Sequence, residues 1–350
     1  MDCFYAAIEC RDDPSVADKP VGVGGSSGRG VLSTCNYIAR EYGCHSAMPV
    51  FQAKQKCPHI VLKPHRFSVY KSESDKIRSI FYDYTELVEP LSLDEAYLDV
   101  THQNRYAWDI AKEIRQRIFE ETQLAASAGV SYNKMLAKIA SDWKKPNGQF
   151  AVLPNQSEEF MKELPVRKIW GIGPKSAEKL SQLGFDTCGD LQKQSIGRLH
   201  STFGTRWGTE LYQLCHGIDE RSVTTNRIRK SMSVEHTFDK NLESLEECID
   251  KMEESIEELK SDLMTSRSQR VIAKLFVKLK FEDFKSTTKE AEFKRLDLEA
   301  VRPLLEEAYT RSSLNVRLMG LGVRFAQSND NDSQQLELDL DLGKKRIASY

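Results

Sequence analysis

Residues 271–281 read Val-Ile-Ala-Lys-Leu-Phe-Val-Lys-Leu-Lys-Phe, and this stretch decides the fold of the C-terminal part of the chain. Because successive side chains of a strand point to opposite faces, its alternation predicts a strand with one apolar face and one largely basic face. The predicted apolar face carries Val271, Ala273, Leu275, Val277, Leu279 and Phe281. The predicted basic face carries Ile272, Lys274, Phe276, Lys278 and Lys280.

A long helix is expected before this strand, because its apolar residues step by three and four and form one stripe. The stripe consists of Leu242, Leu245, Ile249, Met252, Ile256, Leu259 and Leu263. Asn241 is expected to cap the helix, and Asp239 is an equal candidate. Further elements are expected as strands near 231–238, 287–296 and 315–326 and as a helix at 298–310. The resulting β-α-β-β-α-β order is ferredoxin-like, with helices on the apolar sheet face and the lysine face left open.

The N-terminal part predicts strands that alternate with helices, which is typical of a sheet covered by helices. Residues 1–10 are expected to be the end of a strand that passes into a helix. Gly and Pro divide 11–66 into short strands and helices. Later elements are expected at 70–84 (helix), 88–100 (a pair of strands), 106–122 (helix), 125–132 (strand) and 134–142 (helix).

Residues 157–224 show no strand pattern and predict short helices joined by glycine turns. From Lys162 to Arg206 the chain carries eight Lys and Arg against four Asp and Glu, so this region is locally basic. Residues 225–231 are expected to be a linker. Asn, Asp, Ser and Gln dominate 328–350, which predicts a flexible tail.

The composition is that of a globular protein. Of the 350 residues, 40% are hydrophobic and 29% charged, and no apolar run approaches the roughly 20 residues of a membrane span. Membrane proteins, collagen-like fibres and fully disordered chains are therefore excluded. The eight cysteines include no Cys-x-x-Cys pair and there is no signal peptide, so we expect reduced thiols and a cytoplasmic location.

Two adjacent carboxylates, Asp94 and Glu95, interrupt an apolar alternation in Ser92-Leu-Asp-Glu95. Side chains of neighbouring strand residues diverge, so both acids serve one site only at a hairpin bend, which Pro90 makes credible. A Mg²⁺ ion prefers hard oxygen ligands and would offset the repulsion between the two acids. A surface turn with two solvated acids is the alternative.

Thr34, Tyr37 and Arg40 are three residues apart, hence on one side of a predicted helix. A hydroxyl, a phenol and a guanidinium suit a polyphosphate, because the planar guanidinium pairs with phosphate oxygens. An ordinary polar helix face explains the same residues. Lys144 and Lys145 lie in a turn after a helix, from which they either reach a phosphate or remain solvated.

Ile169-Trp-Gly-Ile-Gly-Pro-Lys175 has the helix-hairpin-helix signature. Gly171 and Gly173 leave backbone N–H groups unshielded at a helix start, and Lys175 follows closely. Such a helix start binds anions, so we expect contact with nucleic-acid phosphates without sequence preference. A glycine-rich turn between two helices is the alternative.

The tail contains Gln335-Leu-Glu-Leu-Asp-Leu340, whose leucines recur at every second position. Leucines in a flexible segment have no core to enter, so a short motif that docks in an apolar groove of a partner is one interpretation. A stray amphipathic segment is the other.

Together these motifs resemble those of bacterial translesion DNA polymerases of the Y family, from residue 1 to about 340 and in the family's order. The motifs that carry the resemblance are Met1-Asp-Cys-Phe-Tyr-Ala-Ala-Ile-Glu9, Ser33-Thr-Cys-Asn-Tyr-Ile-Ala-Arg40, Ser92-Leu-Asp-Glu95, Ser131-Tyr-Asn-Lys-Met-Leu-Ala-Lys138 and Lys145-Pro-Asn-Gly148.

The resemblance implies an α+β multidomain fold shaped like a right hand, with an added little finger. The expected parts are palm (1–10 and 67–156), fingers (11–66), helix-hairpin-helix thumb (157–224), linker (225–231), ferredoxin-like little finger (232–327) and tail (328–350). It also implies low-fidelity, template-directed addition of a dNTP to a primer 3′-OH with two Mg²⁺ ions. The expected partners are primer-template DNA and a sliding clamp, with no membrane, and the chain is expected to be a monomer.

By match to the family motifs, Asp94 and Glu95 are the catalytic carboxylates, with Asp94 and the Met1 carbonyl as metal ligands. Tyr5 matches the steric gate that collides with a ribonucleotide 2′-OH. The remaining expected contacts are those to the nucleotide (Phe4, Tyr5, Thr34, Tyr37, Arg40 and Lys145), to DNA (Gly171, Gly173, Lys175, Lys274, Lys278 and Lys280) and to the clamp (Gln335, Leu336, Leu338 and Leu340).

One departure from the family bears on activity. The family's first strand ends in Asp-Met-Asp, and its first Asp binds both metals, whereas this sequence begins at the Met. Asp2 matches the third position, whose carboxylate is not the usual ligand. Taken literally, the chain lacks one carboxylate and a central palm strand, so turnover would be almost lost. A truncated, catalytically impaired protein that binds DNA and the clamp is the alternative function.

A helix-hairpin-helix glycosylase or nuclease is a third candidate. Glycosylases of this kind need a catalytic Asp or Lys downstream of the hairpin, and 190–226 offers no convincing set.

Overall fold

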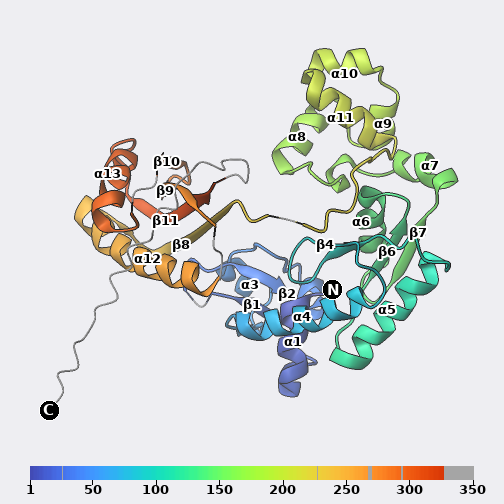
Figure 1. The fold of residues 1–350 in the computed structure, drawn as a ribbon, viewed down its shortest axis with the longest axis horizontal. Helices are drawn as coiled ribbons and strands as arrows, with labels where there is room; N and C mark the ends of the chain where they lie inside the picture. The colour runs from blue at the N-terminus through green and yellow to red at the C-terminus, as the bar shows by residue number, and fades with distance from the viewer. Residues whose placement is uncertain (26, 227, 267–269, 293–294, 327–350) are drawn as a thin grey trace. The chain divides into compact units, whose positions relative to one another are not determined.

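The computed structural model describes residues 1–25, 27–226, 228–266, 270–292 and 295–326, and the chain divides into two compact units (Figure 1). Of the described residues, the first unit holds 1–25 and 30–226, and the second holds 27–29 and those from 228 on. The boundary between residues 227 and 228 falls inside the predicted linker.

The first unit begins with α1 (Phe4–Asp12), which confirms the helix expected at the N-terminus. A three-stranded sheet follows in the order β2-β1-β3, with β1 antiparallel to β2 and parallel to β3. Its elements are the 3₁₀ helix Pro14–Val16, β1 (Val21–Gly24), β2 (Leu32–Cys35), α2 (Tyr37–Glu41), α3 (Val50–Lys56) and β3 (Val61–Lys63). Leu32, Cys35 and Ala53 lie in the buried core of this part.

The prediction that Thr34, Tyr37 and Arg40 share one helix is wrong for Thr34. Thr34 lies on β2, where it pairs with Val23, and only Tyr37 and Arg40 lie on α2. The helix starts after Asn36, because the Asn36 side chain accepts a hydrogen bond from the Ala39 N–H and caps it.

Two long helices and two small sheets form the middle of the first unit. The elements are α4 (Phe67–Tyr82), β4 (Val88–Pro90), β5 (Ala96–Leu98), α5 (Ala107–Thr122), β6 (Ala128–Ser131), α6 (Lys134–Trp143) and β7 (Gln149–Val152). β4 pairs antiparallel with β5, and β6 pairs parallel with β7, a strand that the sequence patterns did not indicate. Isoleucines of α4 and α5 fill the core between these helices.

Short helices complete the first unit, as expected, with strands absent from described residues 157–224. They are α7 (Ser157–Lys162), α8 (Pro174–Gln182), α9 (Cys188–Gln192), α10 (Ile196–Phe203) and α11 (Thr205–Cys215), with 3₁₀ helices at Pro154–Gln156 and Val166–Lys168. A core that includes Leu180, Leu199 and Leu211 joins them.

The second unit is a four-stranded sheet with two helices on one face. The elements are β8 (Ser231–Leu242), α12 (Leu245–Thr265), β9 (Ile272–Phe281), β10 (Ser286–Glu292), α13 (Leu298–Tyr309) and β11 (Val316–Phe325), which confirms the β-α-β-β-α-β order. All neighbouring strands are antiparallel in the order β10-β9-β11-β8. Both helices pack on the apolar face (Figure 1).

Two details of the second unit differ from expectation. α12 begins at Leu245 and is capped by Ser244, because β8 continues its pairing with β11 as far as Leu242. Neither Asn241 nor Asp239 caps the helix, since both lie on that strand. At the start of β9, Ile272 is buried and Ala273 is exposed, because the register with β11 shifts there and inverts the alternation.

Two expectations about the whole chain can be compared with the structure. All eight cysteines are free thiols, as expected. Within the described ranges, the helices are too short or too polar to cross a membrane.

Candidate functional site

The two adjacent carboxylates lie at a hairpin bend between β4 and β5. The Leu91 N–H donates to the Glu95 carbonyl at 2.9 Å and closes the turn. Ser92 Oγ donates to Asp94 Oδ1 at 2.6 Å, and the Asp94 N–H donates to Ser92 Oγ at 3.2 Å. This geometry lets side chains of consecutive residues serve one place, which a straight strand would forbid.

Each of the two carboxylates has a cation beside it. Lys138 Nζ, on α6, lies 3.0 Å from Glu95 Oε1. The Met1 α-amino nitrogen donates to the Asp94 carbonyl at 2.7 Å and lies 3.9 Å from Asp94 Oδ2. Burial lowers the pKa of this amino group, and the neighbouring Asp94 opposes the shift. Asp94 and Glu95 side chains remain 33% and 41% exposed, so both are open to a ligand.

Two cavities meet at the carboxylate turn. The smaller encloses about 320 Å³, and the larger, into which Glu95 also faces, about 670 Å³. Asp94, Met1 and Lys145 line both. The smaller cavity brings together all the residues predicted to contact the nucleotide: Phe4, Tyr5, Thr34, Tyr37, Arg40 and Lys145. The structure thus gathers them beside Asp94 although they come from separate segments of the chain.

The smaller cavity has two cationic side chains. The Arg40 guanidinium lies 4.6 Å from the centre of the Tyr37 ring and donates to the Cys35 carbonyl at 3.2 Å. Lys145 Nζ lies 2.8 Å from Asp142 Oδ1. Burial alone would lower the pKa of Lys145, but the bond to Asp142 raises it above its ordinary value, so the side chain keeps its charge. Two cations in the lining of one cavity suit a polyanionic ligand.

Asp2 is committed to a structural role. Its buried carboxylate accepts hydrogen bonds from Ser127 Oγ at 2.9 Å and from the Asn147 N–H at 2.7 Å. This ties the start of the chain to the turn that carries Lys145. The spacing of the motifs did not predict these hydrogen bonds, because Ser127 and Asn147 lie 125 and 145 residues after Asp2 in the sequence.

The acidic turn fits a divalent cation that a substrate helps to hold. Among the residues that the structure describes, no group of three or more His, Cys, Asp or Glu could hold a metal ion alone. Mg²⁺ is commonly bound by one or two carboxylates together with substrate phosphates and water. Two half-exposed carboxylates next to a cationic cavity match that donor set.

The larger cavity lies between the two small sheets. Residues of both β5 and β6 line it, and in the described part of the chain β5 pairs with β4 and β6 with β7.

The start of α6, which carries Lys138, is held by the chain that follows α11. Asp219 accepts a hydrogen bond from the Met135 N–H at 2.9 Å, and the Gly217 carbonyl accepts one from Asn133 at 2.8 Å. Lys134 Nζ lies 2.6 Å from a Glu89 carboxylate oxygen, and both side chains are mostly buried. The sequence did not predict these three contacts, because the residues in each of them are 45 to 84 positions apart along the chain.

The helix-hairpin-helix motif is exposed at the N-terminus of α8. Gly171 has φ +94°, in the left-handed region, and nothing lies within 4 Å of a Cβ built there or at Gly173. Gly173 is the N-cap residue, and Lys175 is exposed on the first turn. The backbone is therefore accessible to a ligand as large as a phosphate chain.

The lysine face of the second unit is less basic than expected. Lys274 Nζ lies 3.0 Å from Glu290 Oε1, and Lys278 Nζ lies 2.9 Å from Glu235 Oε1. Lys280 lies 5.2 Å from the centre of the exposed Phe284 ring. The prediction of an open lysine face is corrected to a mixed face, because Glu290 of the adjacent strand β10 stands beside Lys274, and Glu235 of β8 reaches Lys278 across β11.

The residues predicted to bind a clamp, Gln335, Leu336, Leu338 and Leu340, lie outside the described residues.

Three family models match successive parts of the chain. The impB/mucB/samB family matches residues 1–142, and its C-terminal domain matches 229–338. A model described as the DNA polymerase-iota thumb domain matches 167–219.

Curated relatives cover nearly the whole chain. DNA polymerase IV of Legionella pneumophila (strain Paris) is 50% identical over 334 residues, which are 94% of each chain. DNA polymerase IV of Ectopseudomonas mendocina (strain ymp) is 48% identical over 327 residues, which are 92% of this chain and 93% of the relative.

Solved structures share the fold. A Y-family DNA polymerase chimera, Dbh-Dpo4(243-245)-Dbh, superposes with a TM-score of 0.84 at 29% identity. The match covers 93% of this chain and 96% of the chimera. An insertion ternary complex of Dbh DNA polymerase has a TM-score of 0.65 at 28% identity, with coverage of 93% and 97%.

Proposed function

The chain belongs to the Y family of DNA polymerases, and we propose that it adds deoxynucleotides to a primer 3′ end at the turn of Asp94 and Glu95. It is a DNA-directed DNA polymerase of the translesion class, and its family implies dependence on a divalent metal. Primer-template DNA and a dNTP are its substrates.

Asp94 and the Met1 carbonyl are the groups that would hold the metal, for which we propose two Mg²⁺ ions, and Glu95 would complete the catalytic carboxylates. Bound there, the ions would neutralise charge on the attacking and leaving oxygens. Ser92 orients the Asp94 carboxylate through its 2.6 Å hydrogen bond, and Lys138 does the same for Glu95 at 3.0 Å. These contacts hold both acids at the bend before substrate arrives.

The smaller cavity is proposed to bind the incoming nucleotide. Arg40, Lys145, Thr34 and Tyr37 would contact its triphosphate, because they supply two cations and two hydroxyls to the cavity lining. Phe4 and Tyr5 lie at the same cavity, and the Tyr5 ring would exclude a ribose 2′-OH.

Nucleic acid is proposed to contact two further surfaces. The exposed start of α8, with Gly171, Gly173 and Lys175, would bind backbone phosphates through its N–H groups. Lys274, Lys278 and Lys280 would bind duplex backbone from the sheet of the second unit. The clamp motif, the monomeric state, the cytoplasmic location and the ranges of palm, fingers, thumb and little finger remain predictions from the sequence.

One observation carries the proposal: a single cavity joins Asp94 to the predicted sugar and triphosphate contacts. Primer extension with Asp94→Ala and Glu95→Ala tests it, with Glu120→Ala on an exposed part of α5 as control. Both alanine variants should lose extension while melting close to the parent, and Glu120→Ala should retain it. Undiminished extension by both would refute the assignment. DNA binding without extension by the parent chain would favour the non-catalytic alternative.

A further inference from the structure

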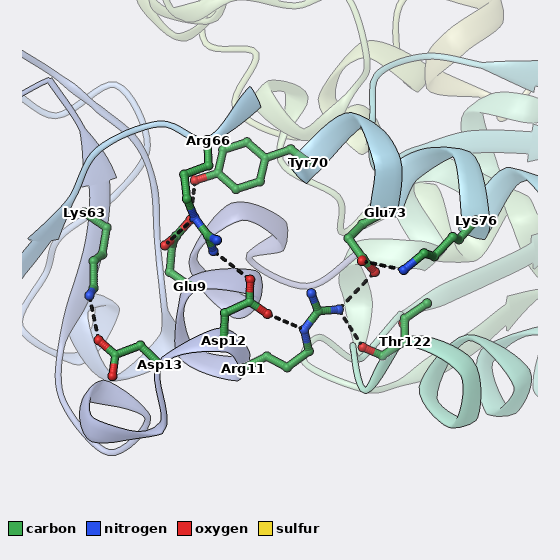
Figure 2. A network of polar contacts seen from close by, with 10 residues as sticks. All are labelled: Glu9, Arg11, Asp12, Asp13, Lys63, Arg66, Tyr70, Glu73, Lys76 and Thr122. Atoms are coloured by element: carbon green, nitrogen blue, oxygen red, sulfur yellow. Dashed lines mark hydrogen bonds and ion pairs between the residues drawn. The ribbon is translucent and has the colours of Figure 1, made fainter. Parts of the chain in front are cut away.

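Glu9 is a buried carboxylate one helical turn after Tyr5 on α1. Residues four apart lie on the same helix face, so the Glu9 carboxylate and the Tyr5 ring face the same neighbour. Glu9 is only 5% exposed, and Figure 2 shows its carboxylate in contact with Arg66 and with the Tyr70 hydroxyl. Arg66 Nε donates to both Glu9 oxygens, at 2.8 and 3.1 Å. This charge-assisted contact compensates for the burial of the carboxylate.

Tyr70, on α4, joins Glu9 to Tyr5. Its hydroxyl donates to Glu9 Oε1 at 2.6 Å, and its ring stacks on the Tyr5 ring with centroids 4.3 Å apart and planes 16° apart. Tyr70 is fully buried. Burial and the hydrogen bond to Glu9 both raise the pKa of the phenol, so it remains a donor. The hydroxyl and the ring of one side chain therefore couple the carboxylate to the face of Tyr5.

Phe67 completes the support of Tyr5. Its ring meets the Tyr5 ring edge-on, with centroids 6.1 Å apart. However, Phe67 is 58% exposed, so the buried Tyr70 supplies the firmer contact. Tyr5 also lines the cavity that Asp94 and Arg40 line. A tilt of the Tyr70 ring would consequently change how far Tyr5 projects into that cavity.

We propose that Glu9 is a positioning residue for sugar selection, acting through the Tyr70 hydroxyl and ring on Tyr5. This inference rests on the proposed function, in which the Tyr5 ring borders the sugar of the nucleotide. Reactive geometry is sensitive to displacements of about 1 Å, so a small tilt suffices to admit a 2′-OH.

Glu73 provides a matched control within the same polar network. It is also 5% exposed, and it accepts from Arg11 at 2.9 Å and from Lys76 at 2.9 Å. Figure 2 shows this carboxylate on the far side of the network from the Tyr70 hydroxyl. Glu73→Gln thus removes an equally buried charge without changing the partner of Tyr70.

The test compares kcat/KM for dCTP with that for CTP opposite template guanine in the full chain. Glu9→Gln and Tyr70→Phe should each lower this ratio about tenfold, which corresponds to about 1.4 kcal/mol. If Glu9 acts through the Tyr70 hydroxyl, Glu9→Gln should add little in the Tyr70→Phe background. Glu73→Gln should lower the melting temperature and leave the ratio unchanged. Affinities for dCTP and CTP on a dideoxy-terminated primer measure the sugar selectivity of binding alone, without turnover.

A ratio within twofold of the parent for both Glu9→Gln and Tyr70→Phe overturns the proposal. An equal loss of selectivity in Glu73→Gln also overturns it, because the effect would then be general loosening. Tyr5→Ala distinguishes a failure of the proposed steric gate from a failure of the proposed role of Glu9. If Tyr5→Ala keeps full sugar selectivity, the proposed steric gate fails. If Tyr5→Ala loses selectivity while Glu9→Gln keeps it, only the role of Glu9 fails.

Discussion

Replacing Glu235 and Glu290 with glutamine should strengthen DNA binding by the sheet of the second unit. Lys278 Nζ lies 2.9 Å from both Glu235 oxygens. Glu290 accepts from Lys274 at 3.0 Å and from Arg324 at 2.7 Å. The bonds from Lys274 and Arg324 lower the pKa of Glu290, so its charge is present at neutral pH. DNA phosphates must therefore compete with two carboxylates for these cations.

The size of the effect follows from the exposure of these ion pairs. All five side chains are at least one third exposed, and such pairs contribute about 0.2–1 kcal/mol each. Glu235→Gln, which removes one pair, should then raise DNA affinity about 1.5- to 5-fold, and Glu290→Gln, which removes two, about 2- to 30-fold. A lysine that newly neutralises one phosphate should steepen the plot of log affinity against log salt by about 0.9.

Fluorescence anisotropy of a labelled primer-template, titrated at several salt concentrations between about 50 and 200 mM, measures both quantities. Glu254→Gln is the control: it removes the same charge from α12 and frees Lys251, its partner at 2.5 Å. α12 packs on the opposite, apolar face of the sheet. A charge on that face is largely screened, since the Debye length is about 8 Å at physiological salt.

Unchanged or weaker binding by both Glu235→Gln and Glu290→Gln would refute the reasoning. An equal gain in Glu254→Gln would attribute the effect to net charge rather than to local pairing. If Lys274→Ala and Lys278→Ala leave affinity and salt slope unchanged, this face does not bind DNA.

Three further predictions concern the first unit. Lys134→Met should lower the free energy of unfolding by about 3 kcal/mol, because it leaves Glu89 charged and mostly buried, and the double variant with Glu89→Gln should recover most of the loss. Since all four tryptophans lie before residue 227, denaturation followed by tryptophan fluorescence reports on this unit. Equal stability of the single and the double variant would contradict a stabilising Lys134–Glu89 ion pair. Burial would raise the pKa of Glu89, but the hydrogen bonds from Lys134 and Thr224 hold it below the ordinary 4.5. The Lys134–Glu89 pair should therefore stabilise the fold above pH 4.5 and stop doing so as the pH falls through the lowered pKa. If the melting temperature falls equally with acid in the parent and in the double variant, this prediction is wrong. Arg40→Ala should raise KM for every dNTP about tenfold or more, as expected for a lost charge-assisted bond, and an unchanged KM in steady-state kinetics would exclude its contact with the triphosphate.

Features that depend on neighbouring residues could be predicted from the sequence. The alternation of β9 and the stripe of α12 each follow from local periodicity, and both indicated which face is buried. The bend at Asp94 and Glu95 was predictable because consecutive strand side chains cannot share a site otherwise. The motif order also sufficed to recognise the family. Element ends were less certain: the start of α12 was misplaced because strand pairing with β11 outlasted the local helix signal.

Contacts between distant segments were decided only by the tertiary structure. Glu235 stands 43 residues from Lys278, so only the order of strands in the sheet brings them together. Glu9 and Tyr70 are 61 residues apart, and nothing in the spacing of α4 distinguishes Tyr70 from any other buried aromatic residue. Sequence patterns were enough to predict most of the helices and strands and their apolar faces, because those properties repeat over a few residues; β7 and the position of Thr34 were the exceptions. The packing of these segments determined which charges are paired and which ring supports Tyr5, because hydrogen bonds and ring contacts act over a few ångströms of space and not along the chain.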